Sequence, residues 1–166
     1  EAVNLPNLTY VDNDDFADTG ELDSLLKALR SRKGPAQDTV ISYGDVLFNK
    51  YIPQSLCQEA DDCVVFVDSN WQEQSSYARL GGFTECTIPN SRRAFNAKIY
   101  LKQLGDNLPK ESIHGVWMGF LKVSPSATKL ITDIIAELLA KPANRKAGIP
   151  QLLQELLNRQ YPIRVL

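Results

Sequence analysis

The sequence is poor in the side chains that most metal centres and nucleophilic sites need. It has one histidine, His114, which lies between polar residues and Gly115 and is interpreted as a surface or edge residue. A histidine-rich metal site and a multi-histidine catalytic apparatus are therefore excluded. The three cysteines, Cys57, Cys63 and Cys86, have neither metal-ligand spacing nor a neighbouring pattern that would activate a nucleophile. They are interpreted as reduced thiols, which predicts a cytoplasmic protein.

Several sequence motifs are also missing. No GxxxxGK[ST], GxGxxG or GxSxG pattern occurs, so P-loop ATPase, dinucleotide-binding and α/β-hydrolase functions have no motif support. There is no signal peptide and no apolar run of membrane length, so no membrane partner is expected. The net charge of -2 provides no field that would hold nucleic acid nonspecifically, and no nucleic-acid partner is expected.

The residues that are present indicate an ordinary globular α/β protein. A length of 166 residues predicts a single domain over 1–166. Leucines recur at helical spacing from Leu22 to Leu29, and Asp18 and Glu21 stand in capping-box register before them, which predicts a helix. Strands are expected at 8–11, 39–43, 63–67, 98–104, 115–123 and the C-terminal end, and further helices at 124–140 and 150–159.

Two apolar segments and the residues between them decide the expected topology. The first strand, from Thr39, breaks at Gly44 and is followed by Asp45 and a predicted helix to about Cys57. The second, 63–67, is an uninterrupted apolar run that ends in Asp68, as expected for a strand covered on both faces. Two strands joined through a helix indicate a parallel βαβ unit. We therefore predict a Rossmann-like, mostly parallel mixed sheet flanked by helices.

The same segments supply the candidate site residues. A carboxylate just beyond a buried strand, such as Asp45, lies where open α/β sheets bind ligands, and it suits a metal that bridges to phosphate oxygens. The alternative is a turn with a helix-capping Asp. Asp68 allows the same two interpretations. Trp71 is a packing residue or a surface for ligand stacking, and Arg92 with Arg93 is an anion clamp or an exposed pair.

Two segments together resemble a known family. Segment 13–25, NDDFADTGELDSL, and segment 43–48, YGDVLF, resemble the sugar-nucleotidyltransferase superfamily, and most of all the MobA-like cytidylyltransferase domains attached to phosphoenolpyruvate mutases in phosphonate biosynthesis. Those domains continue with an apolar strand that ends in Val-Asp, as Val67 and Asp68 do here. A later Gly-x-x-x-Ser stretch resembles Gly119 and Ser124, with one extra residue. The likeness covers nearly the whole chain.

The resemblance implies an enzyme that transfers CMP from CTP to a phosphonate or phosphate acceptor and releases pyrophosphate. Asp45 matches the family acid that helps hold Mg²⁺ and would be the catalytic metal ligand. The nucleotide-binding residues carried over from the family are listed here: Asn13, Thr19, Gly20, Ser24 and Gly44. Asp68, Trp71 and Arg92 are the substrate candidates. The implied partners are CTP and a small acceptor.

The sequence also departs from the family. The family's first strand with its glycine-rich phosphate loop, and its later second metal acid, have no counterpart between Glu1 and Leu166. We therefore expect an incomplete nucleotidyltransferase fold, a piece of a longer chain with little catalysis alone. Its exposed sheet edges could pair with another copy. Two alternatives stay open: a noncatalytic α/β interaction or regulatory module, and a sugar-1-phosphate or phosphocholine nucleotidyltransferase.

Overall fold

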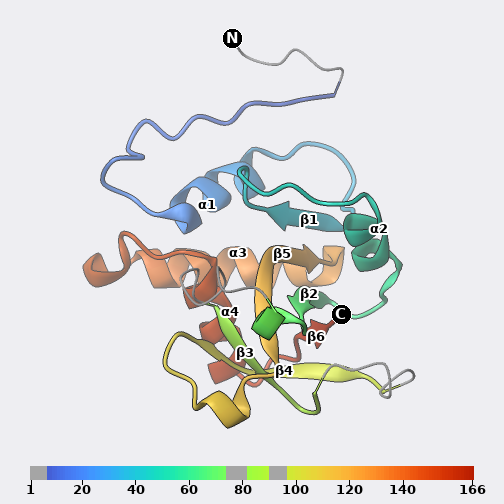
Figure 1. Ribbon diagram of the computed structural model, residues 1–166. Helices are drawn as coiled ribbons and strands as arrows, with labels where there is room; N and C mark the ends of the chain where they lie inside the picture. Colours follow the sequence, from blue (N-terminus) through green and yellow to red (C-terminus); the bar gives the residue numbers. More distant parts are fainter. Residues whose placement is uncertain (1–6, 74–81, 90–96) are drawn as a thin grey trace.

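The computed structural model describes residues 7–73, 82–89 and 97–166 of the chain (Figure 1). Its helices are α1 (Glu21–Ser31), α2 (Tyr51–Gln58), α3 (Pro125–Leu139) and α4 (Ile149–Asn158). Its strands are β1 (Thr39–Ser42), β2 (Cys63–Asp68), β3 (Phe83–Cys86), β4 (Ile99–Gly105), β5 (Gly115–Val123) and β6 (Arg164–Val165). Short 3-10 turns cover Trp71–Glu73, Lys110–Ser112 and Pro142–Asn144. The α/β class predicted from the sequence is confirmed.

The six strands form one mixed sheet in the order β1-β5-β2-β6-β4-β3. A further pairing of β3 with β5 closes β5, β2, β6, β4 and β3 into a ring. Among the pairings between described residues, β2 with β6 is parallel and the others are antiparallel. The prediction of a mixed sheet is therefore confirmed, whereas the prediction that it is mostly parallel is wrong.

The predicted βαβ unit is wrong in one particular respect. Strands β1 and β2 run in the same direction, but β5 lies between them and pairs antiparallel with both. The reason is the length and apolar character of β5, which is buried at almost every position and therefore belongs at the centre of the sheet. Strand β5 lies far along the chain from this segment, so it is a long-range partner that the local pattern of residues 39–68 could not indicate.

Helices cover both faces of the sheet. On one face α1, α3 and α4 pack against the strands in a large apolar cluster that includes Leu22, Val65, Leu121, Ile135 and Leu153, all fully buried. On the other face α2 covers a smaller cluster, in which Ile52 and Leu56 contact Val64 and Phe120. The leucine spacing of the first helix is confirmed, since Leu22 and Leu26 are the residues that α1 buries.

Two local predictions about helix ends are wrong. Helix α1 begins after Gly20, which has no side chain to cap it, so the predicted Asp18–Glu21 capping box does not form. Helix α2 begins at Tyr51 rather than directly after Asp45, which places Pro53 in its first turn, where the missing N–H is tolerated. By contrast, the helix expected at 124–140 begins with a side-chain cap, since Oγ of Ser124 accepts from the backbone N–H of Ala127 at 3.3 Å.

Strand β1 occupies the end of the strand order, paired with β5 on one side. Figure 1 shows it at the upper border of the sheet, beneath the N-terminal arm. Pairing of this edge with a second copy stays a prediction, which light scattering at high concentration would test. The expected strand at 8–11 is absent, because these residues form an extended arm without regular structure. Within the described part of the chain, no helix is long and apolar enough to cross a membrane.

Candidate functional site

The loop that precedes α1 is organised by the side chain of Asn13. Its Nδ2 donates to the hydroxyl oxygens of Thr19, at 3.0 Å, and Ser24, at 2.9 Å. Its Oδ1 accepts from the ammonium group of Lys27 at 2.6 Å. The backbone N–H of Asp15 also lies 3.2 Å from Oδ1, which closes a turn. The structure thus brings together Asn13, Thr19 and Ser24, three residues that the sequence predicted as one nucleotide-binding group.

Gly20 serves close packing of the backbone at this place. A Cβ built on it would lie 2.4 Å from the carbonyl carbon of Lys146 and 2.5 Å from the carbonyl oxygen of Ala147. The N–H of Gly20 donates to the carbonyl of Arg145 at 2.9 Å. Because these contacts are with backbone, no side chain fits here. Whatever its role toward a ligand, Gly20 joins the start of α1 to the connection before α4.

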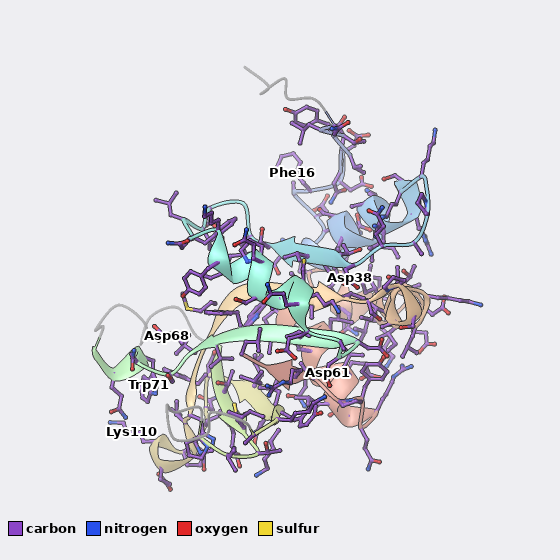
Figure 2. All side chains as sticks on the ribbon, turned by 90° about the vertical axis from the view of Figure 1, so that its right-hand side faces the viewer. Phe16, Asp38, Asp61, Asp68, Trp71 and Lys110 are labelled. Carbon is purple, nitrogen blue, oxygen red and sulfur yellow. The ribbon has the colours of Figure 1, made fainter. Side chains whose placement is uncertain are left out.

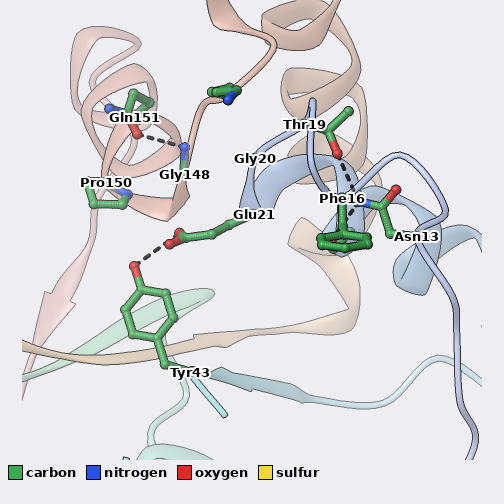
Figure 3. A pocket seen from close by; sticks show the side chains of 11 residues that line it. Asn13, Phe16, Thr19, Gly20, Glu21, Tyr43, Gly148, Pro150 and Gln151 are labelled. Carbon is green, nitrogen blue, oxygen red and sulfur yellow. Dashed lines mark hydrogen bonds between the residues drawn. The ribbon is translucent and has the colours of Figure 1, made fainter. Parts of the chain in front are cut away.

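A cavity of about 580 Å³, the loop cavity, lies against this loop (Figure 3). It is bounded by the 13–24 loop, the end of β1 and the start of α4. The lining residues are Asn13, Phe16, Thr19, Gly20, Glu21, Ser24, Tyr43, Lys146, Gly148, Pro150 and Gln151. Four of the residues carried over from the family resemblance are therefore in its wall. Its lining includes one cationic residue, Lys146, and one carboxylate, Glu21.

A second cavity of about 840 Å³, the strand-end cavity, adjoins the first at the end of β1. It contains Asp45, in the turn that follows β1. The lining residues are Glu21, Tyr43, Asp45, Val46, Gly82, Leu104, Gly105, Asp106, Val116, Trp117, Met118, Gly119, Pro150, Gln151 and Gln154. The two cavities share Glu21, Tyr43, Pro150 and Gln151. Asp45 and the Asn13 group (Asn13, Thr19 and Ser24) thus line two adjoining cavities rather than a single one.

The strand-end cavity has an acidic wall. Its ionisable carboxylates are Glu21, Asp45 and Asp106, and no lysine, arginine or histidine occurs among its described lining residues. Asp106 already accepts a bond from the N–H of Gly82 at 2.8 Å. Like charges at short range repel, so a triphosphate would enter this cavity only with cations that neutralise it. This electrostatic requirement fits a nucleotide that arrives with a divalent ion.

The boundary between the cavities is a hydrogen-bonded pair. The hydroxyl of Tyr43 donates to Oε2 of Glu21 at 3.1 Å (Figure 3). The same oxygen accepts from the N–H of Ile149, also at 3.1 Å. Burial of the phenol raises the pKa of Tyr43, and the neighbouring Glu21 carboxylate raises this pKa further. Tyr43 therefore stays a neutral donor at every physiological pH.

Asp45 suits Mg²⁺ in one of the two ways that proteins bind this ion. Among the described residues, no group of three or more His, Cys, Asp and Glu side chains could hold a metal ion. Such an all-protein site is therefore not found in the described part of the chain. Mg²⁺ is more often bound through one or two carboxylates together with water and phosphate oxygens. The exposed carboxylate of Asp45 fits that second mode.

The predicted substrate residues lie elsewhere. Asp68 ends β2, and its Oδ1 accepts from the N–H of Asn70 at 2.8 Å, which is the turn geometry considered as the alternative from sequence. The ring of Trp71 packs edge-on against Phe83 at 5.3 Å. Neither residue lines the two cavities, and Figure 2 shows both below and to the left of Phe16. Arg92 lies outside the described residues.

Sequence reasoning missed the connecting residues of this region. The sequence pattern places Glu21 in a helix cap and Tyr43 in a strand, and it gives no indication of a role for Asp106. A signal existed for Tyr43, which directly precedes Gly44 and Asp45 in the segment that carries the resemblance. No local signal exists for Glu21, because its partner Ile149 is 128 residues away.

The comparisons with known proteins concern the fold. The chain matches no protein-family model and no curated protein sequence. Its structure is similar to that of the inositol-1-phosphate CTP transferase from T. maritima, with a TM-score of 0.64 and 11% sequence identity. The likeness covers 93% of this chain and 54% of the other, so this chain spans about half the length of that protein. At this identity the likeness establishes that the chain has a nucleotidyltransferase-like fold.

Proposed function

We propose that this chain is part of a nucleotidyltransferase that transfers CMP from CTP to a phosphate or phosphonate acceptor. The observation that carries the proposal is the position of Asp45: its carboxylate follows the edge strand β1, lines a cavity, and adjoins the cavity that holds the Asn13 group. The fold likeness to a CTP transferase supports this assignment, as does the resemblance of segments 13–25 and 43–48 to cytidylyltransferases.

In the proposed reaction an acceptor oxygen attacks the α-phosphorus of CTP in line with the leaving group. The new bond joins the acceptor oxygen to the α-phosphorus, and the bond from that phosphorus to the pyrophosphate oxygen breaks. Such a transfer needs positioning and charge neutralisation more than covalent catalysis. Asp45 would hold Mg²⁺, which when bound supplies positive charge beside the phosphates. The hydroxyls of Thr19 and Ser24 would contact the nucleotide.

The finer parts of the proposal rest on the sequence resemblance. These finer parts are three: a phosphonate acceptor, a phosphoenolpyruvate mutase with isomerase activity in the same protein, and a cytoplasmic location. The fold relative is named for a phosphate monoester acceptor, which supports the phosphate class as a whole. The substrate roles of Asp68, Trp71 and Arg92 also stay proposals.

The test is calorimetric titration of Mg²⁺-CTP into this chain, into Asp45→Ala, and into Asp133→Ala. Asp133 is exposed on α3 and lines neither cavity, so its replacement controls for net charge. We expect binding that Asp45→Ala weakens and Asp133→Ala leaves unchanged. Titration of ATP, GTP and UTP measures the base preference. Absence of binding here and in a polypeptide extended at both ends would overturn the proposal.

A further inference from the structure

Tyr43 occupies the junction between β1 and the Gly44–Asp45 turn, and its ring is held on two sides. It packs edge-on against Trp117, with the ring centroids 5.6 Å apart. On another side it lies against Gly119, where an added Cβ would approach its Cδ2 to 2.6 Å. The ring position is therefore set by β5, and the hydroxyl can point only where the ring directs it.

The carboxylate of Glu21 accepts the hydrogen bond from that hydroxyl and links it to two helices. The residue is the first of α1, and its Oε2 also accepts from the N–H of Ile149, the first residue of α4. A carboxylate at a helix N-terminus is favoured by the free N–H groups and the helix dipole. Gly148 permits this approach, since a Cβ there would lie 2.6 Å from the same oxygen. One carboxylate oxygen thus connects α1, α4 and the end of β1.

We propose that Glu21 and Tyr43 are a positioning pair that fixes Asp45 relative to the Asn13 group. This inference rests on the proposed function. The pair lies in the wall common to both cavities, with Asp45 lining one of them and Asn13, Thr19 and Ser24 lining the other. Asp45 itself is exposed in a turn, so its place depends on how the chain leaves β1. Neither member of the pair is assigned contact with the reacting atoms.

The test combines Tyr43→Phe, Glu21→Gln and the double variant with a matched control, Tyr161→Phe. The hydroxyl of Tyr161 donates to Oδ2 of Asp62 at 3.1 Å, a bond of the same length and kind away from both cavities. Two quantities are measured for each protein: hydrogen exchange of the amides in segment 44–48, and the dissociation constant for Mg²⁺-CTP.

We expect Tyr43→Phe to weaken Mg²⁺-CTP binding about threefold to tenfold, the loss of one net hydrogen bond, and to speed exchange of segment 44–48. Glu21→Gln should add little to the loss in Tyr43→Phe, because without the phenol hydroxyl residue 21 has no bond from Tyr43 to accept. Tyr161→Phe should change neither quantity. If the Glu21→Gln effect is much larger than that of Tyr43→Phe and the two add, Glu21 acts on the ligand directly and the pairing is overturned.

The failure of this inference is distinct from failure of the proposed function. Unchanged exchange of segment 44–48 in Tyr43→Phe and Glu21→Gln overturns the positioning pair, whether or not nucleotide binds. Faster exchange together with unchanged nucleotide affinity also overturns it, because the turn would then move without consequence for the site. If the unaltered chain does not bind Mg²⁺-CTP, Asp45 has no ligand to be positioned for, and the pair is overturned as a positioning device. The exchange data then still show whether the hydrogen bond between Tyr43 and Glu21 holds segment 44–48 in place.

Discussion

The ring of Tyr43 lies where a side chain on Gly119 would have to be. A Cβ at position 119 would approach Cδ2 of that ring to 2.6 Å and Cε2 to 3.2 Å. Gly119 also has a φ of 78°, in the left-handed region that L side chains rarely adopt. Two independent constraints thus require glycine in the middle of β5, directly beneath the strand end that leads to Asp45.

The first prediction follows from this contact. Gly119→Ala should lower the free energy of unfolding by about 1–3 kcal/mol, because it adds backbone strain and displaces the ring of Tyr43. Denaturant unfolding measures the loss. Gly105→Ala is the matched control, since Gly105 also lies in a strand and a Cβ there meets nothing within 4 Å. Equal stability of the two variants would contradict the role assigned to Gly119.

The second prediction concerns metal removal. In the strand-end cavity, the carboxylates of Glu21, Asp45 and Asp106 repel a bare triphosphate. EDTA should therefore weaken CTP binding by about tenfold or more, roughly 1.4 kcal/mol. Asp45→Asn should bind CTP with much less dependence on Mg²⁺, because it removes both a metal ligand and a repelling charge. Equilibrium binding at several Mg²⁺ concentrations checks this. An Mg²⁺ dependence identical in both proteins would remove Asp45 from the metal site.

The third prediction is a pH dependence of stability at Asp62. Hydrogen bonds from the hydroxyls of Ser124 and Ser126, then of Tyr161, hold the pKa of Asp62 below its ordinary value of 3.8. A lowered pKa stabilises the folded state above pH 3.8, and this contribution is lost as the pH falls through the pKa of the folded protein.

Asp62→Asn should therefore cost about 1 kcal/mol near pH 7, a modest loss because the carboxylate is partly exposed to water. The stability difference from the unaltered protein should shrink toward zero as the pH falls below 3.8. Unfolding curves at a series of pH values measure it, with Asp133→Asn as the exposed control. A difference that stays constant with pH would mean that the ionised carboxylate is not the stabilising form.

The fourth prediction concerns the cysteines. Burial raises the pKa of Cys63 to about 12 and that of Cys86 to about 11, so both thiols stay protonated in the folded protein. Cys57 is exposed on α2. A thiol reagent at pH 8 should therefore label one cysteine in the native state and three after denaturation, as mass spectrometry can count. Rapid labelling of Cys63 or Cys86 would show that β2 or β3 opens readily.

Much of the local structure was predictable because it depends on neighbours in the chain. The leucines of α1, the apolar run of β2, the start of α3 at Ser124 and the extent of β5 each follow from periodicity or a cap within one segment. Strand β3 was not expected, since its four residues pair with β4 and β5 rather than showing a pattern of their own. The resemblance predicted Asn13, Thr19 and Ser24 as nucleotide-binding residues; hydrogen bonds join the three, and their contact with a nucleotide stays a prediction.

The sequence by itself determined the α/β class, most helices and strands, and the segments in which candidate residues occur. These features depend on side-chain spacing, which a linear sequence displays directly. Only the tertiary structure decided that β5 separates β1 from β2, that two cavities meet at Glu21 and Tyr43, and that Asp68 and Trp71 lie outside both. Such features depend on contacts between segments that are distant in the chain. The hydrogen bond from Ile149 to Glu21 is an example, because it forms only once the sheet and helices have packed.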